Sequence, residues 1–209
     1  MLDPRFVFLG ALLGIAGSVT YAIRTILGKA APNRVSFFLW SAASLIGFFA
    51  QLDEGVGLPS VLTLVAGVGP GLVLLASFVG RSAPWRISRF DLLCGAAAVA
   101  ALVVWLALDN PTLAVAFAVL ADLLGAVPTV VKAWRAPLSE EPIFYALVAG
   151  NGAITLMTIQ VWTLATWLFP AYILTLGLSL LFVVLLRRRH LGEPASERSA
   201  VQHESASLR

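Results

Sequence analysis

Residues 165–186 read ATWLFPAYILTLGLSLLFVVLL, an apolar run without a charged side chain, and Arg187, Arg188 and Arg189 follow it directly. A run of about 20 apolar residues is what an α-helix needs to cross the hydrocarbon core of a bilayer. The whole chain has a matching composition, since 59% of its 209 residues are hydrophobic and only 12% are charged. Soluble domains are about 45–50% apolar and about 25% charged. The composition therefore excludes a soluble enzyme, a secreted module and a disordered regulator, and it predicts a membrane protein.

Further apolar runs precede this one, separated by short stretches that are rich in charged residues, Pro, Gly or Asn. In chain order the runs span residues 6–27, 35–51, 58–80, 91–108, 111–133, 143–162 and 165–186. The weakest break lies at 162–165, where Trp162 and Thr163 are the main indication of a turn. The expected fold is all-α with seven transmembrane helices. Six spans with one long bent helix is the alternative count.

The basic residues predict the orientation of these spans. Thirteen of the 14 Lys and Arg residues fall on one side of the membrane, and only Arg5 falls on the other. Basic residues concentrate in cytoplasmic loops, so we expect a cell-membrane protein with its N-terminus outside and its C-terminus in the cytoplasm. The arginines then act as topology anchors with some contact to anionic lipid, which excludes a nucleic-acid partner. Residues 190–209 have little apolar content and predict a disordered cytoplasmic tail.

An internal repeat relates the two halves of the chain. When the first run is laid on the fifth, one register pairs Leu12 with Leu120, Gly17 with Gly125, and Val19 with Val127; we call it the first register. Three helices, one extra crossing helix and three more helices place two odd-numbered bundles in parallel orientation. We therefore expect a 3+1+3 arrangement of two parallel three-helix bundles. The expected units are the first bundle at 1–80, a linker helix at 81–109, the second bundle at 110–189 and the tail at 190–209.

This layout, over residues 6–186, resembles the PQ-loop superfamily, which includes the SWEET sugar transporters. The proline–glutamine pair that names the family corresponds here to Tyr21-Ala22 in the first repeat and to Pro128-Thr129 in the second, so only the second proline is retained. Prolines also lie near the cytoplasmic ends of the second and sixth runs, where SWEETs carry gating prolines; these are Pro32 and Pro142.

The segment 32–40, Pro-Asn-Arg-Val followed by a Phe-, Leu- and Trp-rich stretch, also resembles bacterial seven-helix membrane proteins for which no substrate is implied. The resemblance to the superfamily implies a small-solute membrane transporter that works by alternating access, with a sugar or a vitamin-like metabolite as the substrate. A second hypothesis is a non-transporting membrane scaffold, receptor or regulatory module on the same fold. A polar pocket at the membrane midplane would favour the first hypothesis, and a solid core of Leu, Ala and Gly would favour the second.

Asp122 is the polar residue that most needs an explanation, because it lies near the middle of the run 111–133 and so near the bilayer midplane. A charged side chain there costs roughly 2.5–3.5 kcal/mol on insertion scales. Small or polar residues share its helical face at spacings of three and four, including Gly125 and Ala126. This face therefore packs against protein or a water-filled cavity. Asp122 is either a substrate or proton site or a neutral carboxyl that is hydrogen-bonded between helices.

Asn151 lies at nearly the same depth, near the middle of the run 143–162. A buried amide in lipid must find hydrogen bonds, so Asn151 either joins two helices or contacts a ligand. When the sixth run is laid on the second, a register shorter by one position pairs Asn151 with Ser44, which has the same two interpretations. We call this pairing the second register.

Tyr21 continues a stripe of small residues in the first run that is typical of close helix packing; the stripe comprises Gly10, Gly14 and Gly17. The first register pairs Tyr21 with Thr129. Both side chains are candidates for lining a cavity. The predicted substrate-binding residues are therefore Asp122, Asn151, Ser44, Tyr21 and Thr129. The tryptophans mostly lie near the ends of the runs and are expected at the membrane interfaces.

The sequence carries no signature of a soluble enzyme: it has no phosphate-binding glycine loop, no His-Glu-x-x-His motif and no nucleophile elbow. Cys94 is the single cysteine, which excludes an internal disulfide and a cysteine-rich metal site. The run 165–186 has no lysine, which excludes a retinal protein. We expect no enzyme activity, no catalytic residue, no metal and no cofactor. The expected partners are a small-molecule substrate and the lipid bilayer, and the sequence leaves a homo-oligomer open.

Overall fold

The computed structural model describes residues 2–53, 55–80, 86–107 and 111–192. Within these ranges the chain forms seven α-helices and two short 3-10 helices, and it contains no strand. The α-helices are α1 (Val7–Ile26), α2 (Arg34–Asp53), α3 (Ser60–Val79), α4 (Arg89–Ala107), α5 (Pro111–Arg135), α6 (Pro142–Thr158) and α7 (Leu164–Gly192). The 3-10 helices η1 (Pro4–Phe6) and η2 (Pro137–Ser139) precede α1 and α6.

Each predicted apolar run begins within a residue or two of a helix, so the prediction of seven helices is confirmed. The weak break is real: α6 ends at Thr158 and α7 begins at Leu164. The Thr166 hydroxyl accepts a hydrogen bond from the backbone N–H of Thr163 at 3.0 Å, which satisfies a backbone group where the chain re-enters a helix. The last helix continues to Gly192, so the first residues of the predicted tail are helical, and residues 193–209 lie outside the described ranges.

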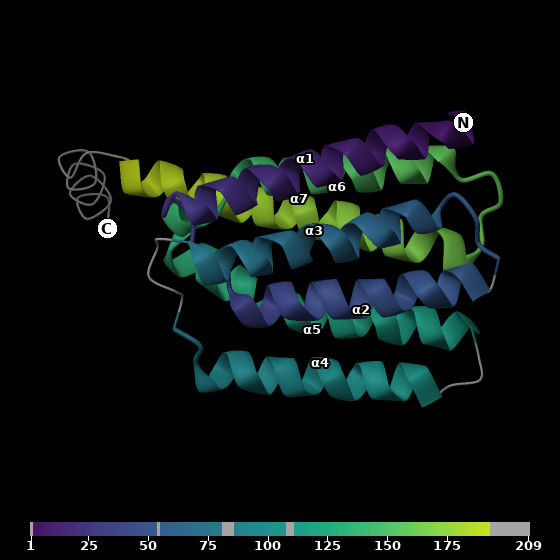
Figure 1. Cartoon of the computed structure of the whole chain (residues 1–209), viewed down its shortest axis with the longest axis horizontal. Helices are drawn as coiled ribbons and strands as arrows, with labels where there is room; N and C mark the ends of the chain where they lie inside the picture. Colours follow the sequence, from purple (N-terminus) through teal and green to yellow (C-terminus); the bar gives the residue numbers. More distant parts are fainter. Residues whose placement is uncertain (1, 54, 81–85, 108–110, 193–209) are drawn as a thin grey trace, which may run out of the picture.

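The helices lie side by side and alternate in direction (Figure 1). The odd-numbered helices run one way, so the connections that follow them fall at the same end of the molecule as the end of α7. Basic residues gather at this end, which we call the basic end; they include Arg24, Arg34, Arg89, Arg135 and Arg187. The one-sided charge distribution inferred from the sequence is thus present in three dimensions for the described residues.

The contacts between helices repeat in the two halves of the chain. In the first half, α3 packs against both α1 and α2. In the second half, α7 packs against both α5 and α6. The halves meet where α1 packs against α6 and where α2 packs against α5, and α4 packs on the outside against α5 and α2.

Several helices are long and apolar enough to cross a membrane. In the part of the chain that the structure describes, these are Pro4–Ile26, Ser60–Val79 and Thr166–Leu191, and the shorter apolar helices are Arg34–Phe49 and Pro142–Thr158. Large apolar side chains also cover the outer faces, for example Leu75, Phe78 and Leu93. In a soluble protein such a surface would be unusual. The chain is therefore a helical membrane protein with multiple apolar helices.

Glycines on α1 allow α6 to approach closely, as the stripe of small residues predicts. A Cβ on Gly10 would lie 2.6 Å from the Oδ1 atom of Asn151, and a Cβ on Gly17 would lie 3.3 Å from the backbone of Phe144. On α3, a Cβ on Gly67 would lie 2.7 Å from the side chain of Leu45 on α2. In these three places, backbone and side chain occupy the space that a larger residue would need.

Candidate functional site

A cavity lies among α1, α2, α3, α5, α6 and α7, and we call it the central cavity. Its lining residues are buried or half-buried. The volume that is open to the centres of water molecules is about 50 Å³, which is room for a few ordered waters. The side chains with polar atoms that line it are Ser18, Trp40, Ser44, Asp122, Tyr145 and Asn151.

Asp122 lies in the wall of this cavity near the middle of α5 and is only 3% exposed. The Tyr172 hydroxyl on α7 donates a hydrogen bond to its Oδ2 atom at 2.6 Å. From α2, the indole Nε1 of Trp40 donates to the backbone oxygen of Asp122 at 3.3 Å. The carboxyl is thus oriented by a neighbouring helix, and its Oδ1 atom keeps acceptor capacity for a further group.

Trp40 corrects one expectation from the sequence. It is 6% exposed and lines the cavity, so it is not a tryptophan of the membrane interface. Its position near the start of the second apolar run suggested an interfacial location. The packing of α2 against α5 instead turns the indole inward, where its N–H finds the backbone of α5.

Asn151 lines the same cavity from α6, and it is also 3% exposed. Its Oδ1 atom is buried and has no hydrogen-bond partner among the described residues. Such an unsatisfied acceptor costs roughly 1–3 kcal/mol. A Cβ on Gly10 would lie 2.6 Å from this Oδ1 atom, and a Cβ on Gly14, which lines the cavity, would lie 3.0 Å from the Nδ2 atom, so the amide packs against α1.

Ser44 on α2 and Ser18 on α1 complete the polar lining. The Ser18 hydroxyl donates to the backbone oxygen of Gly14 at 2.9 Å, which leaves its oxygen free to accept. The structure therefore brings three of the predicted site residues to one cavity. These are Asp122, Asn151 and Ser44.

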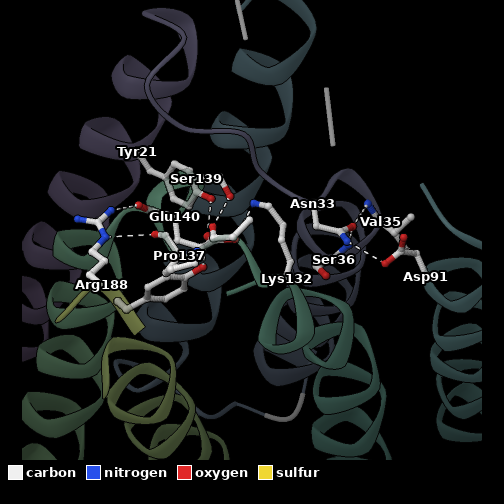
Figure 2. Close-up of polar contacts among 12 residues, drawn as sticks. Tyr21, Asn33, Val35, Ser36, Asp91, Lys132, Pro137, Ser139, Glu140 and Arg188 are labelled. Atoms are coloured by element: carbon white, nitrogen blue, oxygen red, sulfur yellow. Dashed lines mark hydrogen bonds and ion pairs between the residues drawn. The ribbon is translucent and has the colours of Figure 1, made fainter. Parts of the chain in front are cut away.

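Tyr21 belongs to a different group of side chains, nearer the basic end. Its hydroxyl donates to the Oε2 atom of Glu140 at 2.7 Å, and the Tyr145 hydroxyl donates to the same atom at 2.6 Å. The Nζ atom of Lys132 pairs with Oε1 of Glu140 at 2.6 Å, and both of these side chains are fully buried. We call these four residues the basic-end cluster. Figure 2 shows Tyr21 and Lys132 converging on Glu140 from α1 and α5.

The last helix holds the segment that carries Glu140. Arg188 on α7 donates from Nε to the backbone oxygen of Pro137 at 3.2 Å, and from Nη2 to that of Glu140 at 2.6 Å (Figure 2). Next to this segment, Arg24 on α1 forms an ion pair with Glu141. The Glu141 side chain also accepts from the backbone N–H of Ile143 at 3.2 Å and so caps α6.

Thr129 does not line the central cavity. It is fully buried on α5, between the depth of Asp122 and that of Lys132, and its hydroxyl has no hydrogen-bond partner among the described residues. Tyr145 connects the two polar regions, because its side chain lines the cavity and its hydroxyl belongs to the basic-end cluster.

A further polar contact joins α4 to the start of α2. Asn33 donates from Nδ2 to Oδ1 of Asp91 at 3.0 Å, and its own Oδ1 accepts from the backbone N–H groups of Val35 and Ser36 (Figure 2). The other Asp91 oxygen accepts from the backbone and hydroxyl of Ser88. These bonds cap two helices and have a structural role.

Reasoning from the sequence missed four polar partners: Tyr145, Tyr172, Lys132 and Glu140. For Tyr172 the signal was present, since a hydroxyl in an apolar run needs a partner and Asp122 is an acceptor at membrane depth. For Lys132 and Glu140 the signal was misleading, because charges that flank a span normally face water. In the described ranges, no three His, Cys, Asp or Glu side chains gather in one place.

Comparison with known proteins adds no family to this picture: no protein-family model, curated protein or solved structure matches the chain.

Proposed function

We propose that the protein is a small-solute membrane carrier of PQ-loop or SWEET-like form that works by alternating access. The observation that carries this proposal is the central cavity, which lies between the two halves of the chain and is lined by Asp122, Asn151 and Ser44. Carriers built from repeats bind substrate near the midplane where the repeats meet. The cavity is mostly apolar, and the polar side chains of Asp122, Asn151 and Ser44 in its wall at mid-helix depth are the feature that favours a carrier over a scaffold.

The proposed architecture is a 3+1+3 arrangement, with α1–α3 and α5–α7 as two parallel bundles and α4 as the linker helix. The repeated contacts support it, since α3 and α7 each lie against both other helices of their half. The cross-contacts are also reciprocal, because α1 meets α6 and α2 meets α5.

Equivalent residues of the two halves face the same cavity. The first register carries Gly14 to Asp122, and the same offset carries Val65 on α3 to Ile173 on α7. The second register carries Ser44 to Asn151, and all six positions line the cavity. The second register also carries Phe37 to Phe144, and these two rings pack with their centroids 5.9 Å apart. Such pairs are expected when two similar bundles meet about a pseudo-two-fold axis.

The basic-end cluster would close one side of the carrier. Its bonds join α1 and α5 to the start of α6, so access from the basic end requires the Tyr21–Glu140 bond to break. Tyr145 would link this closure to the cavity, because it belongs to both. In the proposed orientation the basic end faces the cytoplasm of a cell-membrane protein, and the C-terminal end of α7 lies there.

A non-transporting scaffold, receptor or regulatory module on the same fold is the second candidate. The small size of the cavity, about 50 Å³, and the close glycine contacts of α1 favour it. It predicts that no solute stabilises the protein and that filling the cavity changes nothing.

A ligand screen followed by a transport assay tests the carrier proposal. Purified protein is screened by thermal shift against sugars, vitamins, nucleosides and amino acids, and each hit is radiolabelled for counterflow into proteoliposomes. Ala66→Phe places a ring in the cavity, and Ala96→Phe on the exposed face of α4 is the matched control. We expect counterflow in the wild type and the control but not in Ala66→Phe. Absence of any hit, or full counterflow by Ala66→Phe, would contradict the proposal.

A further inference from the structure

Two buried carboxyl groups of the helix core differ in their charge partners. Glu140 has a counter-cation, because Lys132 lies 2.6 Å away within the fold. Asp122 has none: in the part of the chain that the structure describes, no Lys, Arg or His nitrogen lies within 4.0 Å of it. Its partners are a tyrosine hydroxyl at Oδ2 and a tryptophan N–H at the backbone oxygen.

A carboxylate without a counter-charge is expensive to bury. The effective cost is several kcal/mol even after relaxation. Asp122 must therefore carry a proton or meet a cation that does not belong to the chain. The central cavity lies against it and is the place where such a cation would be bound.

The other walls of the cavity suit an organic cation. Three aromatic side chains line it, from Trp40, Phe144 and Tyr145, and aromatic faces attract ammonium groups. Aliphatic residues supply most of the remaining wall, including Val65 and Leu176. No Lys, Arg or His is among the lining residues, so nothing there would repel a positive charge.

The polar lining includes acceptors, beside the donors of the Asn151 amide and the Ser44 hydroxyl. The Oδ1 atom of Asn151 is buried and has no hydrogen-bond partner among the described residues. The Ser18 hydroxyl already donates its hydrogen to the backbone oxygen of Gly14, so its own oxygen can accept. Acceptors are what the N–H groups of a protonated amine need. The space for a few waters limits the ligand to a small molecule.

We propose that the central cavity binds a small alkylammonium cation, whose charge pairs with Asp122, whose N–H groups reach Asn151, and whose alkyl groups contact the aromatic and aliphatic walls. This proposal rests on the proposed function only because it takes the central cavity as the substrate site. It specifies the substrate class as small alkylammonium cations. The positive charge replaces the counter-ion that the fold does not supply. An anion of the same size would face the Asp122 carboxyl, and we expect it to bind much more weakly than the cation.

Calorimetric titration of the purified full-length protein in detergent tests the proposal. The probes are methylammonium chloride and tetramethylammonium chloride at fixed ionic strength, with tert-butanol as the neutral molecule and sodium acetate as the anion. Asp122→Asn keeps an acceptor for Tyr172 and removes the charge, and Asp91→Asn makes the same change at a buried site in the cap of α4. Asn151→Val removes an acceptor that methylammonium can use through its N–H groups and tetramethylammonium, which has none, cannot.

We expect at least one of the two cations to bind, and tert-butanol and acetate to show at least about tenfold weaker binding. Asp122→Asn should weaken cation binding by about tenfold or more, and Asp91→Asn should leave it unchanged. If methylammonium binds, Asn151→Val should weaken it, and any tetramethylammonium binding should be unaffected. Equal affinity for tert-butanol and the cations, unchanged binding in Asp122→Asn, or no binding of either cation would overturn the proposal. If Asp122→Asn does not fold, the wild-type comparison of charged and neutral probes still decides.

The two proposals fail in different ways. If a neutral sugar or vitamin is carried into proteoliposomes and neither cation binds, the carrier proposal stands and the cation site is wrong. If the cations bind with the expected selectivity and no solute is transported, the cation site stands and the protein is a receptor or regulator.

Discussion

Replacing Lys132 by Met should destabilise the protein strongly, because it leaves the fully buried carboxylate of Glu140 without its cation. Removing one partner of a buried ion pair costs about 3–5 kcal/mol, most of it the penalty of the charge left behind. Met is close to Lys in length and fills the space of its stem, so lost packing adds little. The Tyr21 and Tyr145 hydroxyls still donate to the carboxyl, and they reduce the penalty without replacing the positive charge.

Two further variants separate charge from packing. Lys29→Met makes the same substitution at an exposed position of the basic end and should change stability by no more than about 0.5 kcal/mol. In the double variant Lys132→Met/Glu140→Gln, neither residue of this pair carries a charge, and the glutamine oxygen can still accept from the tyrosines. The double variant should therefore be more stable than Lys132→Met alone.

The measurement is unfolding by SDS in mixed micelles, followed by tryptophan fluorescence, with thermal melting as a second readout. For chains of this length, 1 kcal/mol corresponds to about 2–4 °C in Tm, so Lys132→Met should melt roughly 6–20 °C lower. A loss no larger than that of Lys29→Met would refute this account of the ion pair. So would a double variant that is less stable than Lys132→Met, because the cost would then lie outside the uncompensated charge.

Three further predictions follow from the fold. With Cys94 replaced by Ala, a cysteine in place of Val56 should react with an impermeant thiol reagent in intact cells, and a cysteine in place of Ala200 only after lysis. Labelling of position 200 in intact cells would show that the expected orientation, with the C-terminus in the cytoplasm, is wrong. Gly14→Ala should cost about 1–3 kcal/mol by overpacking, because its Cβ would lie 2.7 Å from a methyl group of Val65 on α3. Gly150→Ala is the control and should be close to neutral in the same unfolding assay, because a Cβ there meets nothing nearer than 3.5 Å. Tyr172→Phe removes the 2.6 Å hydrogen bond to the Asp122 carboxyl and should lower the free energy of unfolding by about 1–3 kcal/mol. An unchanged midpoint of SDS unfolding would show that this bond contributes nothing to stability.

The helices and their directions were predictable because both depend on local composition. A span needs only enough consecutive apolar residues, and the ends of the runs coincide with charged residues, prolines and glycines that the structure also places at helix ends. The depth of a residue along its span follows from the same count. This is why Asp122 and Asn151, each placed at mid-span by the sequence, do line one cavity.

The direction in which a side chain points around its helix was less predictable, because it depends on which helices become neighbours. Trp40 lies near the start of its span, yet the contact of α2 with α5 buries it. Tyr21 shares a face with the glycine stripe but lies deeper toward the basic end than the cavity, where Glu140 accepts its hydroxyl. The burial of Trp40 and the location of Tyr21 outside the cavity could not be predicted from the helical periodicity of one segment.

Buried charge in a connection was the hardest feature to predict. Lys132 and Glu140 flank the break between two apolar runs, a place where charged side chains usually face water. The 3-10 helix η2 and the two hydrogen bonds from Arg188 instead hold this connection against the core. A chain segment that folds back onto its own helices leaves no periodic signal in the sequence.

The proposed repeat would explain why the cavity has both space and a carboxyl. The first register relates Gly14 to Asp122, and both positions line the cavity. At one position the missing side chain lets α1 approach α6 until a Cβ would lie 3.0 Å from the amide nitrogen of Asn151. At the other position the same place in the repeat carries a carboxyl. Two identical aspartates would repel one another across so small a volume, and two glycines would offer nothing for a ligand to bind. In the proposed 3+1+3 arrangement, the difference between the halves at this one pair would therefore give an asymmetric site with a single carboxyl.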